Sequence, residues 1–544
     1  MNKKSSLIAL TLIATLSTIQ LSAQTKYWVK FKNKTGTPYS VSTPTAFLTA
    51  KSVQRRTTYN IPVDQTDLPV TPSYISQVDN VAGVTVLYAS KWLNGVVIAT
   101  TGTAGISAIN SFSFVMSTGP VNRIKATIPT DEIMNQVSAQ NKSVNTNTFN
   151  YGGSYWQNKQ LGVDCIHNQG FRGQGMTIAV LDDGFNNVDI NQVFDSLRNR
   201  NGILGTRDFV VGGTSVYEDD QHGAMVLSCM AAIKPNMIMG SAPRADYWLL
   251  RTEDVNSETP SEEYNWVRGA EFADSVGADI LTTSLGYTAF DNTSQSHTYA
   301  DLNGKTSPMS IAATMAARKG MFVLNAAGND GGNAWGKIGI PADADSICTV
   351  GAIDSLSNVA GFSSVGPTAD GRIKPDLVSR GLSSCIAAPN GSIQHGSGTS
   401  FATPILAGAV ACFWQAHKTW NNMKILDTLR KTASNAANPD NQRGWGTPNM
   451  CAIPTGIKEQ ANNAFTFNFW PNPFNSEIVI STGFTTEKQL LAEFYNVTGT
   501  LVKTVSLAAG KQEYVLNLEN VSAGIYFLKL SGSQGFAVKK IVKN

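Results

Sequence analysis

At positions 176–184 the chain reads Met176-Thr177-Ile178-Ala179-Val180-Leu181-Asp182-Asp183-Gly184. The first six residues form a short, mostly apolar run that is typical of a strand buried on both faces of a sheet. The run ends directly on Asp182, so the pattern predicts a carboxylate at the carboxyl end of a buried strand. An Asp-Gly step also favours an Asx turn, so these residues alone leave a purely structural role open.

Two further apolar runs follow the same pattern and are separated by helical stretches. Buried strands are expected at 278–282 and 321–325, and helices at 264–276 and 309–319. This alternation predicts an α/β fold with a doubly wound parallel sheet. Because ligands bind such sheets beyond the carboxyl ends of the strands, reactive residues are expected there.

Two other motifs contain residues suited to nucleophilic catalysis. His222-Gly223-Ala224 begins an apolar helical run, in a chain with only 5 histidines. Gly396-Ser397-Gly398-Thr399-Ser400 leads through Pro404 into a second apolar helix, which places Ser400 near a helix N-terminus. A backbone amide there can donate to a developing oxyanion. Taken singly, a surface histidine and a capping serine remain open as alternatives.

Together the motifs occur in the order Asp, His, Ser, one of three known chain orders for this catalytic triad. From about residue 156 to residue 453 the chain resembles the subtilisin-like serine proteases, the subtilase family. Three further motifs support the resemblance and occur in matching order. They are Gly240-Ser241-Ala242-Pro243, Thr283-Ser284-Leu285-Gly286 and Ala326-Ala327-Gly328-Asn329.

The resemblance implies a serine endopeptidase that works through an acyl-enzyme and requires no cofactor for its chemistry. Ser400 would be the nucleophile, His222 the general base and acid, and Asp182 the residue that orients the imidazole. Asn329 would donate to the oxyanion beside the Ser400 amide. The residues expected to pair with the backbone of peptide or protein substrates are Ser284, Leu285 and Gly286.

Two positions depart from the family's pattern. Ala224 stands where Thr usually follows His-Gly, which removes a hydroxyl near the imidazole. Asp183 stands where Ser or Thr usually follows the catalytic Asp, and a second acid there would change the pH dependence of catalysis. Asp183 also competes with Asp182 as the orienting residue, although the register of the motif favours Asp182.

Residues 1–23 have the pattern of a secretory signal peptide. Lys3 and Lys4 precede the apolar run 7–16, and small residues lead to an expected cleavage point after Ala23. An apolar run of this length is too short for a membrane anchor, which needs about 20 residues. The mature protein is therefore expected to be soluble and exported.

Residues 24–145 contain strand-like pieces and predict a compact α+β unit. Within it, Gln54-Arg55-Arg56 and Ile61-Pro62-Val63-Asp64 resemble the pro-regions of secreted Bacteroidetes-type subtilases. The resemblance implies a zymogen, in which this unit inhibits the enzyme, assists its folding and is then cut away. We place the self-cleavage zone in the polar stretch 140–148, because exposed Asn- and Thr-rich segments are readily cut.

Beyond the catalytic domain expected at 151–455, residues 464–544 alternate in hydrophobicity between glycine-containing turns and predict a β-sandwich. Trp470-Pro471-Asn472-Pro473, Asn496-Val497-Thr498-Gly499 and Ala523-Gly524-Ile525-Tyr526 resemble the type A sorting domain of the type IX secretion system. The resemblance implies export by that machinery through the periplasm and outer membrane, to the cell surface or the medium. A carbohydrate-binding or adhesive sandwich is the alternative.

The composition excludes some partners. Lys plus Arg number 42 and Asp plus Glu 39, and a net charge of +3 over 544 residues points to neither nucleic acid nor an anionic membrane. The 6 cysteines allow up to three disulfides and show no zinc-type spacing. We expect a monomer.

Two other functions remain as alternatives. A catalytically silent subtilase-fold protein for surface binding or adhesion would be indicated by decay of the catalytic positions, yet all are present. A metallohydrolase could use Glu218-Asp219-Asp220 beside His222, but the chain has no His-Glu-x-x-His motif or second nearby histidine. We therefore expect no catalytic metal, and we treat this acidic run as a candidate structural Ca²⁺ site.

Overall fold

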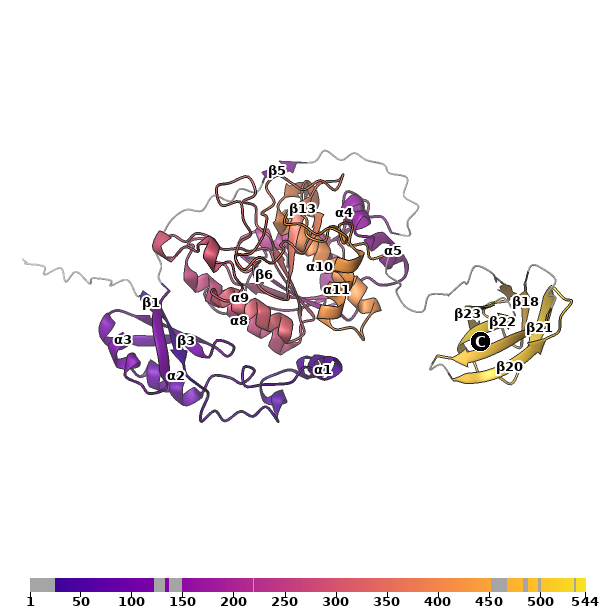
Figure 1. The fold of residues 1–544 in the computed structure, drawn as a ribbon, viewed down its shortest axis with the longest axis horizontal. Helices are drawn as coiled ribbons and strands as arrows, with labels where there is room; N and C mark the ends of the chain where they lie inside the picture. The colour runs from indigo at the N-terminus through magenta and orange to yellow at the C-terminus, as the bar shows by residue number, and fades with distance from the viewer. Residues whose placement is uncertain are drawn as a thin grey trace, which may run out of the picture. The chain divides into compact units, whose positions relative to one another are not determined.

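The computed structural model describes residues 25–121, 133–136, 149–218, 220–451, 467–482, 488–497, 500–532 and 535–544. The chain divides after residue 452 into two units, each of which is described by itself. Figure 1 colours the first unit from indigo to orange and the second yellow. Among the described residues, no helix has both the length and the apolarity to span a bilayer.

The first unit is built on a seven-stranded sheet in which every neighbouring pair is parallel. In spatial order its strands are β14 Leu377–Arg380, β13 Cys348–Ile353, β12 Phe322–Ala326, β11 Ile280–Thr283, β6 Thr177–Asp182, β10 Asp246–Arg251 and β7 Ile203–Asp208. β6, β11, β12 and β13 are buried along their whole length. The predicted doubly wound sheet is confirmed, and its order reverses between β6 and β11, where such sheets bind ligands.

Helices cover both faces of this sheet. α8 Pro260–Val276 and α9 Pro308–Arg318 share a core cluster with Ala179 and Leu181 of β6. Side chains alternate along a strand, so Val180, between Ala179 and Leu181, faces the opposite side of the sheet. The helices α7 His222–Ala231 and α10 Thr399–Ala416 pack together there, against β6 and against β11 to β14.

Most of the remaining elements of this region are short. They are α4 Tyr155–Gln160, α5 Val163–Asn168, η2 Gln192–Phe194, α6 Asp195–Asn199, β8 Ile233–Lys234, β9 Ile238–Met239, η3 Thr293–Gln295, η4 Tyr299–Asp301, β15 Ser384–Ala387, β16 Ile393–Ser397 and α11 Asn422–Thr432. β16 pairs antiparallel with β15 and with β5 Ile133–Gln136. The strand that leads to Ser400 is therefore paired with a segment from the N-terminal part of the chain.

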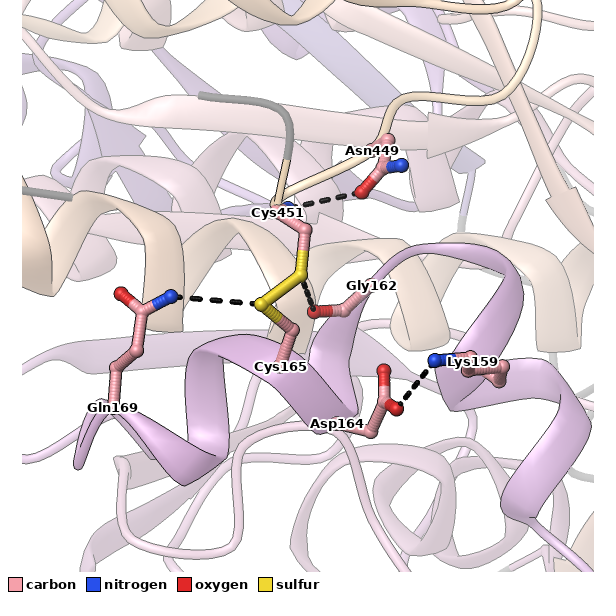
Figure 2. Close-up of a disulfide and its surroundings, with 7 residues drawn as sticks. All are labelled: Lys159, Gly162, Asp164, Cys165, Gln169, Asn449 and Cys451. Carbon is pink, nitrogen blue, oxygen red and sulfur yellow. Dashed lines mark hydrogen bonds and ion pairs between the residues drawn. A yellow bond between two sulfur atoms is a disulfide. The ribbon is translucent and has the colours of Figure 1, made fainter. Parts of the chain in front are cut away.

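One disulfide joins the beginning and the end of this region. Cys165 in α5 is bonded to Cys451, 286 residues later, with the two Cα atoms 5.9 Å apart (Figure 2). Beside it the Met450 amide donates to the Leu161 carbonyl at 2.9 Å. The four other cysteines are buried thiols: Cys229, Cys348, Cys385 and Cys412. Of the disulfides that the sequence allows, one is therefore formed.

The N-terminal region is an α+β unit with a long extension. Its antiparallel sheet has the order β2 Val84–Ser90, β3 Gly95–Thr100, β1 Thr25–Phe31 and β4 Val115–Pro120, accompanied by α2 Pro72–Asp79 and α3 Thr103–Asn110. Residues 32–71, between β1 and α2, form what we call the arm. The arm contains η1 Pro44–Ala46 and α1 Ala50–Tyr59, and α1 contacts α8 (Figure 1).

The C-terminal unit consists of two antiparallel sheets. One contains β17 Asn468–Trp470, β18 Glu477–Ser481 and β21 Glu513–Asn517, and the other contains β20 Leu501–Leu507, β19 Leu490–Asn496, β22 Gly524–Gly532 and β23 Gly535–Lys543. Ile478 and Leu516 of the first sheet lie in one buried cluster with Phe494 and Leu528 of the second. This shared core confirms the predicted β-sandwich.

Candidate active site

Asp182 and His222 form a direct hydrogen bond at the carboxyl edge of the sheet. Asp182 is the last residue of β6 and is fully buried, and His222 is the first residue of α7. The Asp182 Oδ1 atom lies 2.5 Å from His222 Nδ1. An ionised carboxylate accepts from Nδ1–H, which fixes the tautomer in which Nε2 is the basic nitrogen. The pair therefore has the geometry of an oriented general base.

Gly223 explains how the helix comes so close to the strand. A Cβ atom at this position would lie 2.3 Å from the Gly184 carbonyl oxygen and 2.9 Å from the Asp182 Cβ. Any side chain would therefore push the start of α7 away from β6 and break the bond between Asp182 and His222. The glycine after the histidine is required by this contact between backbones.

Ser400 lies in the first turn of α10, and the residue after it packs near the imidazole. Its neighbour Phe401 has its ring centroid 6.2 Å from that of His222. The Ser400 hydroxyl donates to the Ser284 carbonyl at 3.4 Å, and the Ser284 hydroxyl donates to the Ser400 carbonyl at 2.8 Å. The first turn of a helix has amides without intrahelical acceptors, so the Ser400 amide is placed to stabilise an anion near its own hydroxyl.

Asn329 follows β12 and is held by Thr399, the residue before Ser400. The Asn329 Oδ1 atom accepts from the Thr399 amide at 2.9 Å and from the Thr399 hydroxyl at 3.0 Å. The Thr399 hydroxyl in turn accepts from the Gly328 amide at 3.2 Å. Because both bonds use the oxygen of the side-chain amide, the Nδ2 donor points away from Thr399. Thr399 was given no role from the sequence, although its position directly before the serine was a signal.

The three residues expected to contact substrate differ in their burial and in their contacts. Ser284 is buried against Ser400, whereas Gly286 is exposed. The Leu285 carbonyl accepts from Asn325 Nδ2 at 3.3 Å, and Tyr287 exchanges backbone hydrogen bonds with Ile340. The segment is thus fixed at both ends and reaches the surface at Gly286.

Asp183 is placed differently from Asp182. Its Oδ1 atom accepts from the Gly223 amide at 3.2 Å rather than from the imidazole. Burial, and then the charge of Asp182, raise the pKa of Asp183 well above its ordinary value, which favours the neutral acid. The geometry therefore supports Asp182 as the partner of His222.

A second group of carboxyls lies against Tyr287, the residue after Gly286, and was not predicted from the sequence. We call Glu253, Glu258 and Glu262 the carboxyl cluster, since one oxygen of each lies within 4.8 Å of the others. Glu253 and Glu258 follow β10, and both accept hydrogen bonds from residues that follow β11. Tyr287 donates its hydroxyl to Glu253, and the Asp291 amide donates to the Glu258 carbonyl at 2.9 Å.

Burial, together with nearby carboxylates, favours protonation of the carboxyl cluster. Burial is the largest cause in each case, and it raises the pKa of Glu253 to about 7, of Glu258 to about 9 and of Glu262 to about 11. The neighbouring carboxylates add to the shift. Closely spaced glutamates between 253 and 263 were the signal available in the sequence.

Two groups of the described residues could offer ligands to a metal ion. One is the carboxyl cluster, and the other is Asp182, Asp183 and His222. For the acidic run proposed as a Ca²⁺ site, Glu218 accepts from the Ser215 hydroxyl, and Asp219 lies outside the described residues. The calcium hypothesis therefore stays a prediction.

Comparison with known families gives three matches along the chain. Residues 173–446 match the subtilase family, residues 26–141 match the peptidase S8 propeptide domain of Bacteroidota, and residues 468–544 match a secretion system C-terminal sorting domain. The type of each region therefore agrees with the resemblances drawn from its motifs.

Individual relatives agree with the central match. Subtilisin NAT of Bacillus subtilis subsp. natto is 30% identical over 285 residues, which are 51% of this chain and 66% of that protein. The chain thus spans just under two thirds of the length of this relative. A subtilisin of Bacillus pumilus is 30% identical over 281 residues, 51% of this chain and 90% of that protein. Subtilisin Savinase of Lederbergia lenta is 28% identical, with 91% of its length covered. On these grounds the chain belongs to the subtilase family.

Proposed function

We propose that the chain is an exported serine endopeptidase in which Asp182, His222 and Ser400 form the catalytic triad. The observation that carries the proposal is the 2.5 Å contact between Asp182 Oδ1 and His222 Nδ1, beside the helix turn that contains Ser400. This arrangement leaves the basic nitrogen of the imidazole for proton transfer with a nucleophile.

In the proposed reaction, Ser400 Oγ attacks the carbonyl carbon of the scissile peptide bond while His222 takes the hydroxyl proton. The histidine then gives this proton to the leaving amine, and an acyl-enzyme remains on Ser400. A water molecule, deprotonated by the same histidine, releases the acid product. Asp182 stays ionised and stabilises the imidazolium in both steps.

The developing oxyanion would be bound by two donors, the Ser400 amide and Asn329 Nδ2. Asn329 is suited to this because Thr399 engages its side-chain oxygen, so the amide nitrogen would be the donor to the oxyanion. Ser284, Leu285 and Gly286 would pair with substrate backbone as an added strand. Substrates would therefore be extended segments of peptides or unfolded proteins.

The other regions would serve export and activation. Residues 24–145 would act as an inhibitory pro-region that is removed around 140–148, which makes the precursor a zymogen. The C-terminal sandwich would direct the protein to the type IX secretion machinery, across the periplasm and outer membrane. We further propose that the protein is a monomer and requires no cofactor for its chemistry, with calcium restricted to a structural role.

The test compares the full chain with its Ser400→Ala variant, and Ser392→Ala serves as the control because Ser392 is an exposed serine near the same helix. We expect the wild type and the control to release the pro-region and to cleave unstructured casein. Ser400→Ala is expected to do neither, and a fluorophosphonate is expected to label Ser400. Equal behaviour of wild type and Ser400→Ala would overturn the proposal in favour of a catalytically silent binding protein.

A further inference from the structure

The arm of the N-terminal region docks on the C-terminal ends of two central helices. α8 is followed by Gly277 and α9 by Gly320, both with positive φ. A Cβ atom at Gly277 would lie 2.8 Å from the Cβ of Lys51, and one at Gly320 would lie 2.6 Å from Cδ1 of Ile61. Both helix ends therefore need glycine for the close approach of the arm as well as for their backbone conformation.

Arg55 of the arm enters the space between these two helix ends. Its guanidinium donates to the carbonyls of Lys319 at 3.2 Å, of Asp274 at 3.3 Å and of Ala278, and to Asp274 Oδ1 at 2.5 Å. Carbonyls at a helix C-terminus lack intrahelical donors and carry partial negative charge, so a planar cation with several donors fits them well. The Arg55 side chain is only 3% exposed.

Arg56 also binds Asp274 and extends the network of ion pairs to Asp67. It donates to both carboxylate oxygens of Asp274 at 3.0 Å and to Asp67 Oδ1 at 2.6 Å. Asp67 also accepts from Lys319 at 2.8 Å, and the side chains of Asp67 and Asp274 are fully buried. Arginines of the arm therefore pair with carboxylates and carbonyls in a site where these side chains are almost completely buried.

The site lies at the opposite edge of the sheet from the candidate active site. Ala278 and Lys319 precede β11 and β12, whereas Ser284 and Asn329 follow the same two strands. β11 is 4 residues long, which separates the two edges by roughly 13 Å. A group bound at the first edge therefore does not compete with substrate at the second.

We propose that the C-terminal ends of α8 and α9 form a guanidinium-binding socket that keeps the pro-region bound to the catalytic region after the connecting chain is cut. The ligand class is an arginine pair on a helix, here Arg55 and Arg56, and Asp274 is the central acceptor. Release of the pro-region then requires opening of this socket as well as clearance of the active site. The inference rests on the proposed function in one respect, namely that cleavage separates the two regions.

The test uses the full chain with Ser400→Ala and a recognition sequence for a specific viral protease inserted after Asn145. Cutting at the insert replaces self-cleavage, so retention of the N-terminal fragment is measured whether or not the native chain is active. No cysteine precedes Cys165, so any retained fragment is held without a covalent bond. The dissociation rate is followed by gel filtration at successive times after cutting.

We expect the fragment with Arg55 intact to remain bound. Removing one partner of a buried ion pair costs enough to predict release on the order of 100-fold faster or more in Arg55→Ala and in Asp274→Asn. Arg55→Lys keeps the charge but lacks the fork that reaches several carbonyls, so it should release at an intermediate rate. The matched control is Lys51→Ala on the same helix, because its ion pair with Asp279 is 40% exposed on the lysine side.

Thermal unfolding of each uncut chain shows whether a variant is folded before it is cut. If Arg55→Ala does not fold, the rates of Arg55→Lys and Asp274→Asn decide the question. Release of all arginine and aspartate variants at the rate of the Lys51→Ala control would overturn the socket proposal. Inactivity of the wild-type chain in the casein assay would instead count against the proposed function and leave this measurement unaffected.

Discussion

Asp182 and Asp183 are adjacent in the chain, yet they are placed for different tasks. Asp182 accepts a hydrogen bond from His222. Asp183 instead faces the backbone of α7 and accepts a hydrogen bond from the Gly223 amide. Burial and the charge of Asp182 raise the pKa of Asp183, which favours the neutral form of the second acid. The two carboxyls therefore give a matched pair for mutagenesis.

We expect Asp182→Asn to lower kcat by about 10,000-fold, because the amide no longer holds the imidazole in the required tautomer. Asp183→Asn should change kcat by less than about tenfold at pH 7, since an amide resembles the neutral acid that the raised pKa of Asp183 favours. Kinetics on one peptide substrate with both pure variants would check this. A larger loss in Asp183→Asn than in Asp182→Asn would reverse the assignment of the two residues.

Asn329 is expected to act only when charge develops on the substrate carbonyl. Asn329→Ala should therefore reduce kcat by about 100- to 1,000-fold with little change in KM. Asn333→Ala is a suitable control, because Asn333 is an exposed asparagine close by in the chain that bonds to Asp330. A rise in KM with kcat unchanged would indicate that Asn329 binds the ground state instead.

The principal site residues could be predicted from the sequence because each stands in a short motif at a strand end or a helix start. Thr399 could not, since its role depends on which atom of the Asn329 amide it contacts in space. The carboxyl cluster was missed for a similar reason. Its glutamates are near one another in sequence, but their burial beneath Tyr287 depends on how two segments of the fold meet.

At the scale of elements, the predicted strands and helices were found close to their expected positions. The helix expected from residue 264 begins earlier, as α8 starts at Pro260. Thr259 and Glu262 form a capping box there, and proline suits the first helical turn, so polar residues extend the helix beyond its apolar pattern. The strand order and the docking of α1 could not be predicted from the sequence, because both are fixed by packing between distant segments.

The carboxyl cluster makes the connection between two loops sensitive to alkaline pH. A glutamate whose pKa is raised in the folded state stabilises the fold below its ordinary pKa, and this contribution is lost as the pH rises through the folded value. For Glu258 that value is about 9, with burial as the largest cause. The free energy of unfolding should therefore fall between about pH 5 and pH 9.

Glu258→Gln removes this titration, so the variant should be more stable than the parent at pH 9 by on the order of 2 kcal/mol or more. Urea unfolding of the Ser400→Ala chain at pH 5, 7 and 9 would measure the difference. Glu218→Gln is the control, because the Ser215 hydroxyl lowers the pKa of the exposed Glu218 and its titration lies below this range. Parallel pH curves for Glu258→Gln and its parent would contradict the assignment.

At the scale of the whole molecule, the N-terminal region, the catalytic region and the sandwich each have a core or sheet of their own. Composition changes along the chain were sufficient to predict these three folded parts. The contact between the first two could not be predicted, since it requires Arg55 and Arg56 to meet helix ends more than 200 residues further along the chain, as in the 219-residue separation of Arg55 and Asp274.

The disulfide between Cys165 and Cys451 gives the catalytic region a closed covalent ring. By the chain-entropy relation, closing a loop of 286 residues stabilises the fold by about 6 kcal/mol. We expect Cys165→Ser with Cys451→Ser to lower the free energy of unfolding by up to this amount, measured by urea unfolding in the Ser400→Ala background. An unchanged value would mean that the ring adds nothing to the fold.

The ring has a second consequence, for damage rather than for folding. If the backbone is cut once anywhere between the two cysteines, both pieces remain one molecule until the disulfide is reduced. Loss of everything after Cys451 also leaves the ring intact. A protein exported among proteases, as we propose for this chain, could thus be nicked or trimmed without coming apart.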